Sequence, residues 1–274
     1  MDCKEKNKAL EARLLSLAGN NLVVAFSGGV DSSLLLLKCC QAARERGTEV
    51  TAVTMQTRLH PHGDVDIARR VAEEAGARHV VIEIDELDDA GILMNPIDRC
   101  YRCKRCLFGK LRQMADEQGV SCVIEGTNWD DLHTYRPGIK ALKELDIESP
   151  LAELGITKTD VRQMAREMGL SVAQRASTPC MATRFPYGTR LDYEMMDRVD
   201  EAEKWLRAQG FYNVRLRVHG DTARLEIDHK EMGRLLQIRN AVVDRLKTMG
   251  FAYITLDLEG FRSGSMDIHI KKKD

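Results

Sequence analysis

Residues 21–37, NLVVAFSGGVDSSLLLL, decide the fold of the first part of this chain. The apolar run 22–26 is typical of a buried parallel strand, and a second apolar run of helix length follows the glycine turn. A strand, a glycine turn and a helix N-terminus in this order form an anion site, because unpaired backbone N–H groups and the helix dipole favour negative charge there. The stretch therefore predicts a phosphate-binding loop.

The side chains of the loop suit a nucleotide phosphate. Glycines allow a close backbone approach and hydroxyls add donors, which gives the predicted phosphate contacts Ser27, Gly28, Gly29, Ser32 and Ser33. Asp31 is unexpected among phosphate donors, and a Mg²⁺ ion that bridges its carboxylate to a pyrophosphate explains it. The string is neither a Walker A motif nor a dinucleotide fingerprint. A glycine turn without a ligand is the alternative interpretation.

The bulk composition limits the classes of protein that fit. A length of 274 residues predicts one large domain or two modest ones. The net charge of −1, from 41 basic and 42 acidic residues, disfavours a nucleic-acid or membrane partner. No apolar run approaches the roughly 20 residues that span a bilayer, and MDCKEKNK is not a signal peptide. We therefore expect a cytoplasmic protein whose cysteines are thiols, metal ligands or nucleophiles.

Strands and helices alternate along the first part of the chain. Strands are expected at 22–26, 49–55, 79–84 and 121–125, and helices at 4–18, 34–46, 64–75, 100–118 and 159–168. This alternation predicts an α/β fold with a doubly wound parallel sheet. Ligands of such sheets bind beyond the carboxyl ends of the strands, so the loop and the segments 54–57 and 125–131 are expected to converge. These segments add Thr54, Gly126 and Thr127 to the predicted ATP contacts.

The pattern changes after Gly188. A helix is expected at 192–208, strands at 213–218 and 222–228, a helix at 229–247 and a strand at 251–258. The short turn His-Gly-Asp between the first two strands indicates a hairpin. We therefore expect two domains, an ATP-binding domain at 1–187 and a smaller α+β domain for substrate binding and oligomerisation at 188–274.

Two groups of cysteines are candidates for chemistry. Cys180 follows a proline among small residues, and Arg184 nearby could lower its pKa and make it a nucleophile; an incidental thiol is the alternative. Cys100, Cys103 and Cys106 have C-x-x-C spacing, which fits a zinc knuckle, a redox pair, an iron–sulfur site or an ordinary helix start. A zinc knuckle needs a second such pair, which the sequence lacks, whereas Cys180 could supply a third sulfur.

Several motifs together resemble a known family. SGGVDS at 27–32 resembles the PP-loop of the ATP pyrophosphatases, which cleave ATP between its α- and β-phosphates. It is followed in order by EGTNWDDLHTYRPG, SPLAELGITKTDVRQMA, STPCMATRFPYG and NVRLRVHGDTARLEI. With these blocks, nearly the whole chain resembles the LarE family of sulfur-insertion enzymes, which serve nickel-pincer nucleotide biosynthesis for lactate racemase maturation. The resemblance implies an adenine nucleotide alpha hydrolase-like fold and an ATP-dependent sulfurtransferase.

The resemblance also implies a reaction. The substrate would be pyridinium-3,5-biscarboxylic acid mononucleotide, whose carboxylate ATP adenylates before a sulfur nucleophile displaces AMP. The implied cofactors are ATP, Mg²⁺ and a [4Fe-4S] cluster that carries a transferable sulfide on Cys100, Cys103 and Cys180. In the alternative branch of the family, Cys180 donates its own sulfur and becomes dehydroalanine. The resemblance implies a homo-oligomer, with a hexamer as the expected size.

Residue roles follow from the same resemblance. Catalytic roles fall on Asp31, Lys158 and Cys180, with Lys158 as the extra cation for the phosphates; an ordinary helix-start lysine is the alternative. Arg215 and Arg217 share one face of a strand and, from the resemblance, are expected to clamp the phosphate of the substrate; a solvated polar face of the sheet is the alternative. Arg184 and Glu203 complete the predicted substrate contacts.

Three other functions remain open from the sequence. A PP-loop tRNA thiolase would need a basic RNA-binding surface, which the near-neutral charge disfavours. An amidating ligase leaves the cysteines without a role. A non-catalytic ATP-binding sensor is disfavoured by the intact Ser27, Asp31, Ser32 and Lys158.

Overall fold

The computed structural model describes all residues except 61–62, 135, 176–178, 263 and 267–274. It divides into an N-terminal unit, Met1–Ile92 with Asp98–Thr178, and a C-terminal unit, Leu93–Ile97 with Pro179–Asp274. The second unit thus begins before the domain boundary expected at 187/188. The segment Leu93–Ile97 is connected to the rest of this unit by Asn95, whose side chain donates to the carbonyl oxygens of Phe185 and Pro186 at 3.0 and 2.8 Å.

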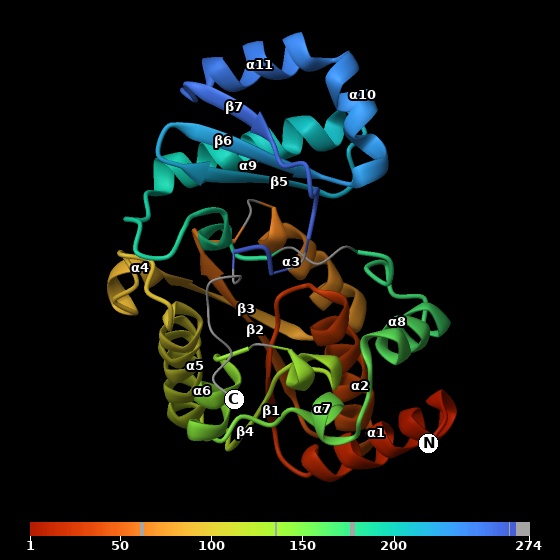
Figure 1. The fold of residues 1–274 in the computed structure, drawn as a ribbon. Coiled ribbons are helices and arrows are strands. Elements are labelled where there is room, and N and C mark those ends of the chain that lie inside the picture. The colour runs from red at the N-terminus through yellow and green to blue at the C-terminus, as the bar shows by residue number, and fades with distance from the viewer. Residues whose placement is uncertain (61–62, 135, 176–178, 263, 267–274) are drawn as a thin grey trace. The chain divides into compact units, whose positions relative to one another are not determined.

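The N-terminal unit is built on a parallel sheet with the strand order β3-β2-β1-β4 (Figure 1). Its strands are β1 (Leu22–Ala25), β2 (Val50–Thr57), β3 (Arg78–Ile84) and β4 (Cys122–Ile124). Leu22 and Val24 of β1 belong to one buried cluster, and Val23 and Ala25 belong to another. Successive side chains of a strand point to opposite faces, so both faces of the sheet are covered. The expected doubly wound α/β fold is confirmed.

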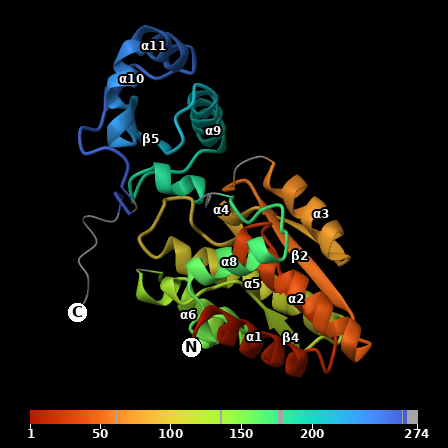
Figure 2. The ribbon, with the colours of Figure 1, turned by 90° about the vertical axis from the view of Figure 1, so that its right-hand side faces the viewer.

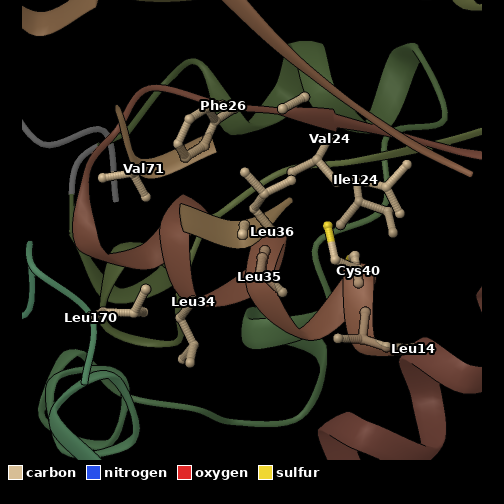
Figure 3. Close-up of a cluster of buried hydrophobic side chains, with 14 of the residues drawn as sticks. Leu14, Val24, Phe26, Leu34, Leu35, Leu36, Cys40, Val71, Ile124 and Leu170 are labelled. Carbon is tan, nitrogen blue, oxygen red and sulfur yellow. The ribbon is translucent and has the colours of Figure 1, made fainter. Parts of the chain in front are cut away.

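Helices form a layer on each face of this sheet. The first layer contains α1 (Cys3–Leu17), α2 (Val30–Arg46), α3 (Asp64–Ala75) and α8 (Lys158–Glu167), and Figure 2 views the unit from this side. The other layer contains α5 (Arg99–Glu117) and α6 (Ile139–Glu144). Figure 3 shows Leu36 of α2 on the side of Val24 and Phe26 and Leu34 on the side of Leu170; all five belong to the buried cluster that packs α2 against the sheet.

Short elements were not expected from the sequence. They are α4 (Glu86–Asp89), α7 (Pro150–Glu153) and the 3₁₀ turns η1 (Asp130–His133) and η2 (Met181–Arg184). Each has four residues, which is too short for a periodic apolar pattern to emerge.

The helix after the glycine turn begins earlier than expected. The sequence placed its start near residue 34, whereas α2 starts at Val30. Gly29 is its N-cap in an extended conformation (φ −78°, ψ 159°), so the chain turns helical immediately after the two glycines. Asp31 and Ser32 therefore lie in the first turn of α2, where backbone N–H groups have no partner within the helix, and the N–H of Ser33 makes the first helical hydrogen bond, to the carbonyl of Gly29.

The start of α8 is fixed by a capping box. Thr157 Oγ1 accepts from the backbone N–H of Asp160 at 3.2 Å, and the Asp160 carboxylate accepts from the Thr157 N–H at 2.9 Å. The same carboxylate binds Lys6 Nζ of α1 at 2.7 Å. This ion pair connects the N-terminal helix α1 to the capping box at the start of α8.

The C-terminal unit is a small α+β structure. It contains α9 (Tyr193–Ala208), β5 (Val214–His219), β6 (Thr222–Ile227), η3 (His229–Glu231), α10 (Met232–Gln237), α11 (Arg239–Thr248) and β7 (Tyr253–Leu256). β5 and β6 form the expected antiparallel hairpin, and β7 pairs in parallel with β6. The single helix expected at 229–247 is wrong, because Ile238 (φ −102°, ψ 17°) interrupts it between α10 and α11.

No helix in the part of the chain that the structure describes is long and apolar enough to cross a membrane.

Candidate active site

The glycine turn is organised by its own hydroxyl groups. Gly28 has φ +67°, and a Cβ there would lie 3.0 Å from the backbone of Ala68 in α3, so only glycine fits. Ser32 Oγ accepts from the N–H of Ser27 at 3.3 Å and donates to the carbonyl of Gly29 at 3.2 Å. The N–H of Gly29 in turn reaches Ser27 Oγ at 3.3 Å. The turn thus has a defined shape at the N-terminus of α2, as a phosphate site requires.

Ser33 differs from the other predicted phosphate contacts. Its side chain is fully buried, and its Oγ has no hydrogen-bond partner among the described residues. Its backbone N–H donates to Gly29 O at 3.0 Å, as part of the first helical turn. The structure therefore places the Ser33 hydroxyl in the interior rather than on the surface of the loop.

Asp31 is held between two side chains from distant segments. Its Oδ2 pairs with Lys158 Nζ at the start of α8, and its Oδ1 accepts from Asn128 Nδ2 at 3.1 Å. The Lys158 backbone N–H donates to Asp130 Oδ2 at 2.8 Å, which joins α8 to the segment after β4. The structure thus brings the predicted catalytic residues Asp31 and Lys158 together.

Asn128 was not among the predicted site residues. Its side chain is 3% exposed, and its Oδ1 accepts from the N–H groups of Asp130 and Asp131 at 3.0 and 3.2 Å. This local turn fixes the amide that faces Asp31. The signal in the sequence was its place directly after the fourth strand, where ligand contacts of parallel sheets gather.

Gly126 and Thr127 shape the segment that faces the loop. A Cβ at Gly126 would lie 3.0 Å from the backbone nitrogen of Ser32, so the end of β4 passes directly over the first turn of α2. Thr127 donates from its N–H and its hydroxyl to the carboxylate of Glu125 at 2.9 and 2.8 Å. The same carboxylate accepts from the Ser149 hydroxyl at 2.5 Å. The Thr127 side chain is therefore engaged in building the turn.

Thr54 lies near the carboxyl end of β2. Its hydroxyl donates to the carbonyl of Phe26 at 2.7 Å and lies 2.8 Å from Nε2 of His79. The side chain thus anchors the residue immediately before the glycine turn.

Arg175 contacts the glycine turn without any signal in the sequence. Its Nη1 donates to the carbonyl of Gly28 at 2.9 Å, and its Nη2 pairs with Asp64 of α3 at 2.5 Å. An isolated arginine at the end of a loop has no pattern that predicts such a contact.

The donors of this site fit a magnesium–nucleotide complex. A carboxylate oxygen of Asp31 is the type of ligand that Mg²⁺ prefers, and the N-terminus of α2 with Lys158 supplies positive potential for phosphates. Asp31 and Lys158 are both partly exposed, with exposed side-chain fractions of 18% and 34%. The arrangement can therefore receive a phosphate chain and a metal ion.

The cysteines differ in burial. Cys100 is exposed and Cys103 half-buried in the first turns of α5, where positions i and i+3 are neighbours on the helix surface. Burial raises the pKa of Cys40 and of Cys122 to about 11 and also raises that of Cys106. Across the described ranges, no group of three His, Cys, Asp or Glu side chains is placed to hold a metal.

Cys180 belongs to the C-terminal unit, whereas Cys100 and Cys103 belong to the N-terminal unit. The three-cysteine set therefore stays a prediction. Of the motif STPCMATR, Ser177 and Thr178 lie outside the described residues. Cys180 is half-buried, and its carbonyl accepts from Thr183 Oγ1 at 2.7 Å.

Arg184 and Glu203 are core residues of the C-terminal unit. Both are fully buried, and Arg184 binds the Glu203 carboxylate through Nε and Nη2 at 2.9 and 2.8 Å. Glu203 also accepts from Arg207 at 2.7 Å and from the N–H of Leu216 in β5 at 3.0 Å. Burial alone would raise the pKa of Glu203, but the hydrogen bond and charge of Arg184 outweigh it and lower that pKa.

The substrate-binding roles expected for the pair stay predictions, and the contacts that the structure shows lie within the protein. The sequence assigned Arg184 and Glu203 to substrate binding, whereas the structure engages both with protein groups and leaves no exposed surface on either. Arg184 Nη1 also donates to the carbonyls of Pro179 and Cys180 at 2.9 and 3.3 Å. It therefore shapes the backbone around Cys180.

Arg215 and Arg217 differ in their surroundings. Arg217 is buried and binds Glu226 at 2.8 Å, Ser265 at 2.9 Å and the carbonyl of Thr183 at 2.7 Å. Arg215 is half-buried, donates to the carbonyl of its neighbour Val214 and stacks over the ring of Phe261 at 5.2 Å. Burial, and then the charge of Arg184, lower the pKa of Arg215 to about 10. Of the two, Arg215 is the arginine available to an anion.

Comparisons with known proteins agree with this geometry. The profile of the PP-loop domain matches residues 3–135. Pyridinium-3,5-bisthiocarboxylic acid mononucleotide synthase of Lactiplantibacillus plantarum is 38% identical over 267 residues, which cover 97% of this chain and 95% of that protein. An uncharacterized protein of Synechocystis is 37% identical over 89% of this chain and 91% of its own length.

Similarity to RNA-modifying proteins is more limited. The tRNA-specific 2-thiouridylase MnmA of Zymomonas mobilis is 31% identical over 59% of this chain and 52% of its own length. The full-length similarity is therefore to the LarE type and not to the thiouridylases. The chain belongs to the LarE family and is a PP-loop ATP-dependent sulfurtransferase.

Proposed function

We propose that this enzyme converts pyridinium-3,5-biscarboxylic acid mononucleotide to its thiocarboxylate and then to the bisthiocarboxylate, with one ATP for each sulfur. The observation that carries the proposal is the Asp31–Lys158 pair at the phosphate loop, in a chain similar over its full length to a synthase of the bisthiocarboxylate.

The first step activates a carboxylate. A carboxylate oxygen of the substrate attacks the α-phosphorus of ATP, the bond to the bridging oxygen breaks, and pyrophosphate leaves with an acyl adenylate formed. The N–H groups at the start of α2 and the ammonium of Lys158 stabilise the charge that develops on the departing pyrophosphate. Asp31 would hold Mg²⁺, which would shield the phosphate charges.

The second step replaces AMP by sulfur. In the sacrificial form, Cys180 Sγ attacks the acyl carbon and AMP leaves, which gives a thioester. Removal of the Cys180 Cα proton then breaks the Cβ–Sγ bond, so the product keeps the sulfur as a thiocarboxylate and Cys180 becomes dehydroalanine. The contacts of Arg184 with the carbonyls of Pro179 and Cys180 support a defined backbone at this residue.

The sulfur of the second step can instead come from a cluster, and for this form of the reaction we infer that Cys100, Cys103 and Cys180 hold a [4Fe-4S] cluster. Cys100, which is exposed, and Cys103, which is half-buried, lie one helical turn apart, and this spacing fits two positions of such a cluster. When bound, the cluster supplies a transferable sulfide. Iron and acid-labile sulfide analysis after anaerobic purification, with visible absorption, tests it in wild type and in Cys100→Ser and Cys103→Ser variants. Iron-free wild-type protein that turns over repeatedly would exclude it.

We infer that the substrate phosphate binds at Arg215. The support is its half-buried guanidinium, which a planar bidentate contact with phosphate would suit. Arg217, engaged with Glu226, holds the hairpin that presents it.

The experiment that tests the function measures pyrophosphate release and product mass together. Wild-type enzyme should release pyrophosphate only with the pyridinium substrate, and Cys180→Ala should release pyrophosphate but form no thiocarboxylate. Asp31→Ala should do neither. Turnover that depends on tRNA instead of the pyridinium nucleotide would favour the thiouridylase function and contradict the proposal.

A further inference from the structure

Arg175 connects the phosphate loop to α3 of the N-terminal unit. It donates to the carbonyl of Gly28 at 2.9 Å and pairs with Asp64 at 2.5 Å. Its guanidinium is largely buried, with an exposed side-chain fraction of 18%. A partly buried, paired arginine has a more defined geometry than a surface one.

The contact with Gly28 sets the orientation of one peptide plane. The C=O of Gly28 and the N–H of Gly29 belong to the same planar trans peptide and point in opposite directions. A donor that holds the carbonyl therefore fixes the direction of the Gly29 N–H, which is one of the predicted phosphate donors. Gly28 adopts a left-handed conformation (φ +67°), and a contact that holds its carbonyl is useful because glycine, without a Cβ, has access to many other conformations.

A second arginine, Arg162, holds the backbone that carries Arg175. Arg162 of α8 donates to the carbonyls of Ala173 and Arg175 at 3.0 and 3.1 Å. Arg162 lies four residues after Lys158, so both project from the same side of α8. One helix thus fixes both the lysine that binds Asp31 and the backbone that carries Arg175.

We propose that Arg175 is a positioning residue: it fixes the phosphate loop and also anchors the start of the segment that leads to Cys180. The second half of this inference rests on the proposed function. Cys180 follows Arg175 by five positions, and a chain of that length spans at most about 18 Å. If Arg175 is held at the phosphate loop, Cys180 cannot lie farther than this span from residue 175, whatever the arrangement of the two units. This limits the distance between Cys180 and the adenylate.

The first test measures nucleotide binding without chemistry. Calorimetry with the non-cleavable analogue α,β-methylene ATP and Mg²⁺ should show about tenfold weaker binding for Arg175→Ala, because a charged hydrogen bond to the loop is lost. Arg175→Lys should recover part of this loss. Arg70→Ala is the matched control. Arg70 is an exposed arginine of α3, and its Nε lies 3.9 Å from Oε1 of Glu74 in the same helix. Wild-type affinity in Arg175→Ala would overturn the loop-positioning role.

The second test measures how many adenylates receive sulfur. The ratio of thiocarboxylate formed to pyrophosphate released should fall at least threefold in Arg175→Ala, because an unanchored segment lets water compete for the adenylate. A merely structural role would lower both products together and leave the ratio unchanged, and that result would overturn the anchoring. Arg175→Gln, compared by thermal unfolding, replaces Arg175→Ala if the latter fails to fold.

The outcomes separate this inference from the proposed function. If the wild type releases no pyrophosphate with the pyridinium substrate, the proposed function fails, and the analogue titration still decides whether Arg175 positions the loop. If the wild type turns over and Arg175→Ala matches it in both tests, the function stands and the inference fails.

Discussion

Lys158 Nζ and Asp31 Oδ2 form an ion pair between the first turns of α8 and α2, although 127 positions of sequence separate the two residues. The pair places a cation and a metal-binding anion at one phosphate loop. It is also partly exposed, so a nucleotide can reach both groups. Because adenylation needs both charges, the pair is the natural place to test the site.

Replacing Lys158 by alanine should lower kcat/KM for pyrophosphate release about 10- to 100-fold, since a charge-assisted contact with the phosphates is lost. Lys158→Arg keeps the charge and should retain more activity. Steady-state pyrophosphate assays check this, with Lys8→Ala on the exposed face of α1 as the control. An unchanged kcat/KM in Lys158→Ala would reduce the residue to an ordinary start of a helix.

Gly126→Ala should damage the site through contact and not through charge. The added methyl would lie 3.0 Å from Ser32 N and 3.3 Å from Asp31 Cβ. Overpacking of this kind costs about 1–3 kcal/mol and would shift the first turn of α2. We expect a lower Tm and a higher KM for ATP.

The control for this change is Gly109→Ala in α5, where nothing lies within 4 Å of the added methyl. It should raise the Tm slightly, because alanine is favoured over glycine in a helix by about 1 kcal/mol. Equal behaviour of the two variants would show that the close approach at Gly126 has no role.

Glu203→Gln should destabilise the C-terminal unit at neutral pH by about 3 kcal/mol, because Arg184 would remain buried without its counter-charge. The folded-state pKa of Glu203 is lowered, so its contribution is full above the unfolded value of about 4.3 and is lost as the pH falls through the folded value. The difference between wild type and variant should therefore shrink in acid.

Urea unfolding can follow this effect in one unit. The chain has two tryptophans, and in a Trp129→Phe background the fluorescence of Trp205 in α9 reports on the C-terminal unit. A stability difference between the wild type and the Glu203→Gln variant that does not change with pH would contradict the ionised pair.

Alkylation should divide the cysteines by burial. Cys100 is exposed and should react with iodoacetamide in the folded protein, whereas the buried Cys40, with its pKa raised to about 11, should react only after unfolding; Cys122, which is half-buried and has a pKa of about 11, should react more slowly than Cys100. Mass spectrometry of peptides from native and denatured samples checks the order. Equal rates at Cys40 and Cys100 would contradict the described burial.

Arg215→Met and Arg217→Met should have different consequences. Arg215 is available to an anion, so its loss should raise KM for the pyridinium substrate several-fold and leave the affinity for ATP unchanged. Arg217 binds Glu226, so its loss should lower stability first. The two variants are compared by KM and by thermal unfolding, and an Arg215 variant with wild-type KM would remove it from the substrate site.

The parts of the fold that repeat a pattern could be predicted from the sequence. The run 22–26 and the glycines after it indicated β1 and the loop, and alternation indicated the parallel sheet. Lys158 was assigned to the phosphates by the family resemblance, and the structure shows that it pairs with Asp31. Local pattern and topology were sufficient for the strand and the loop, whereas the lysine needed the resemblance.

Other features depend on partners that no local pattern reveals. In the sequence, Glu203 occupies a polar position of an amphipathic helix. Its burial is favourable because of tertiary contacts, above all the one with Arg184, 19 residues away. Ile238 is an apolar residue in a helical pattern, yet the backbone breaks there. Arg175 stands alone in a loop, and its role follows only from where Gly28 and Asp64 come together.

The bond between Lys6 and Asp160 has a practical consequence. Asp160 belongs to the capping box of the helix that begins with Lys158, so α1 stabilises the helix start that carries this lysine of the nucleotide site. Deleting the first turns of α1, or displacing them with an N-terminal purification tag, should lower the affinity for ATP even though no residue of these turns contacts the reacting groups. Preparations meant for kinetics are better tagged elsewhere.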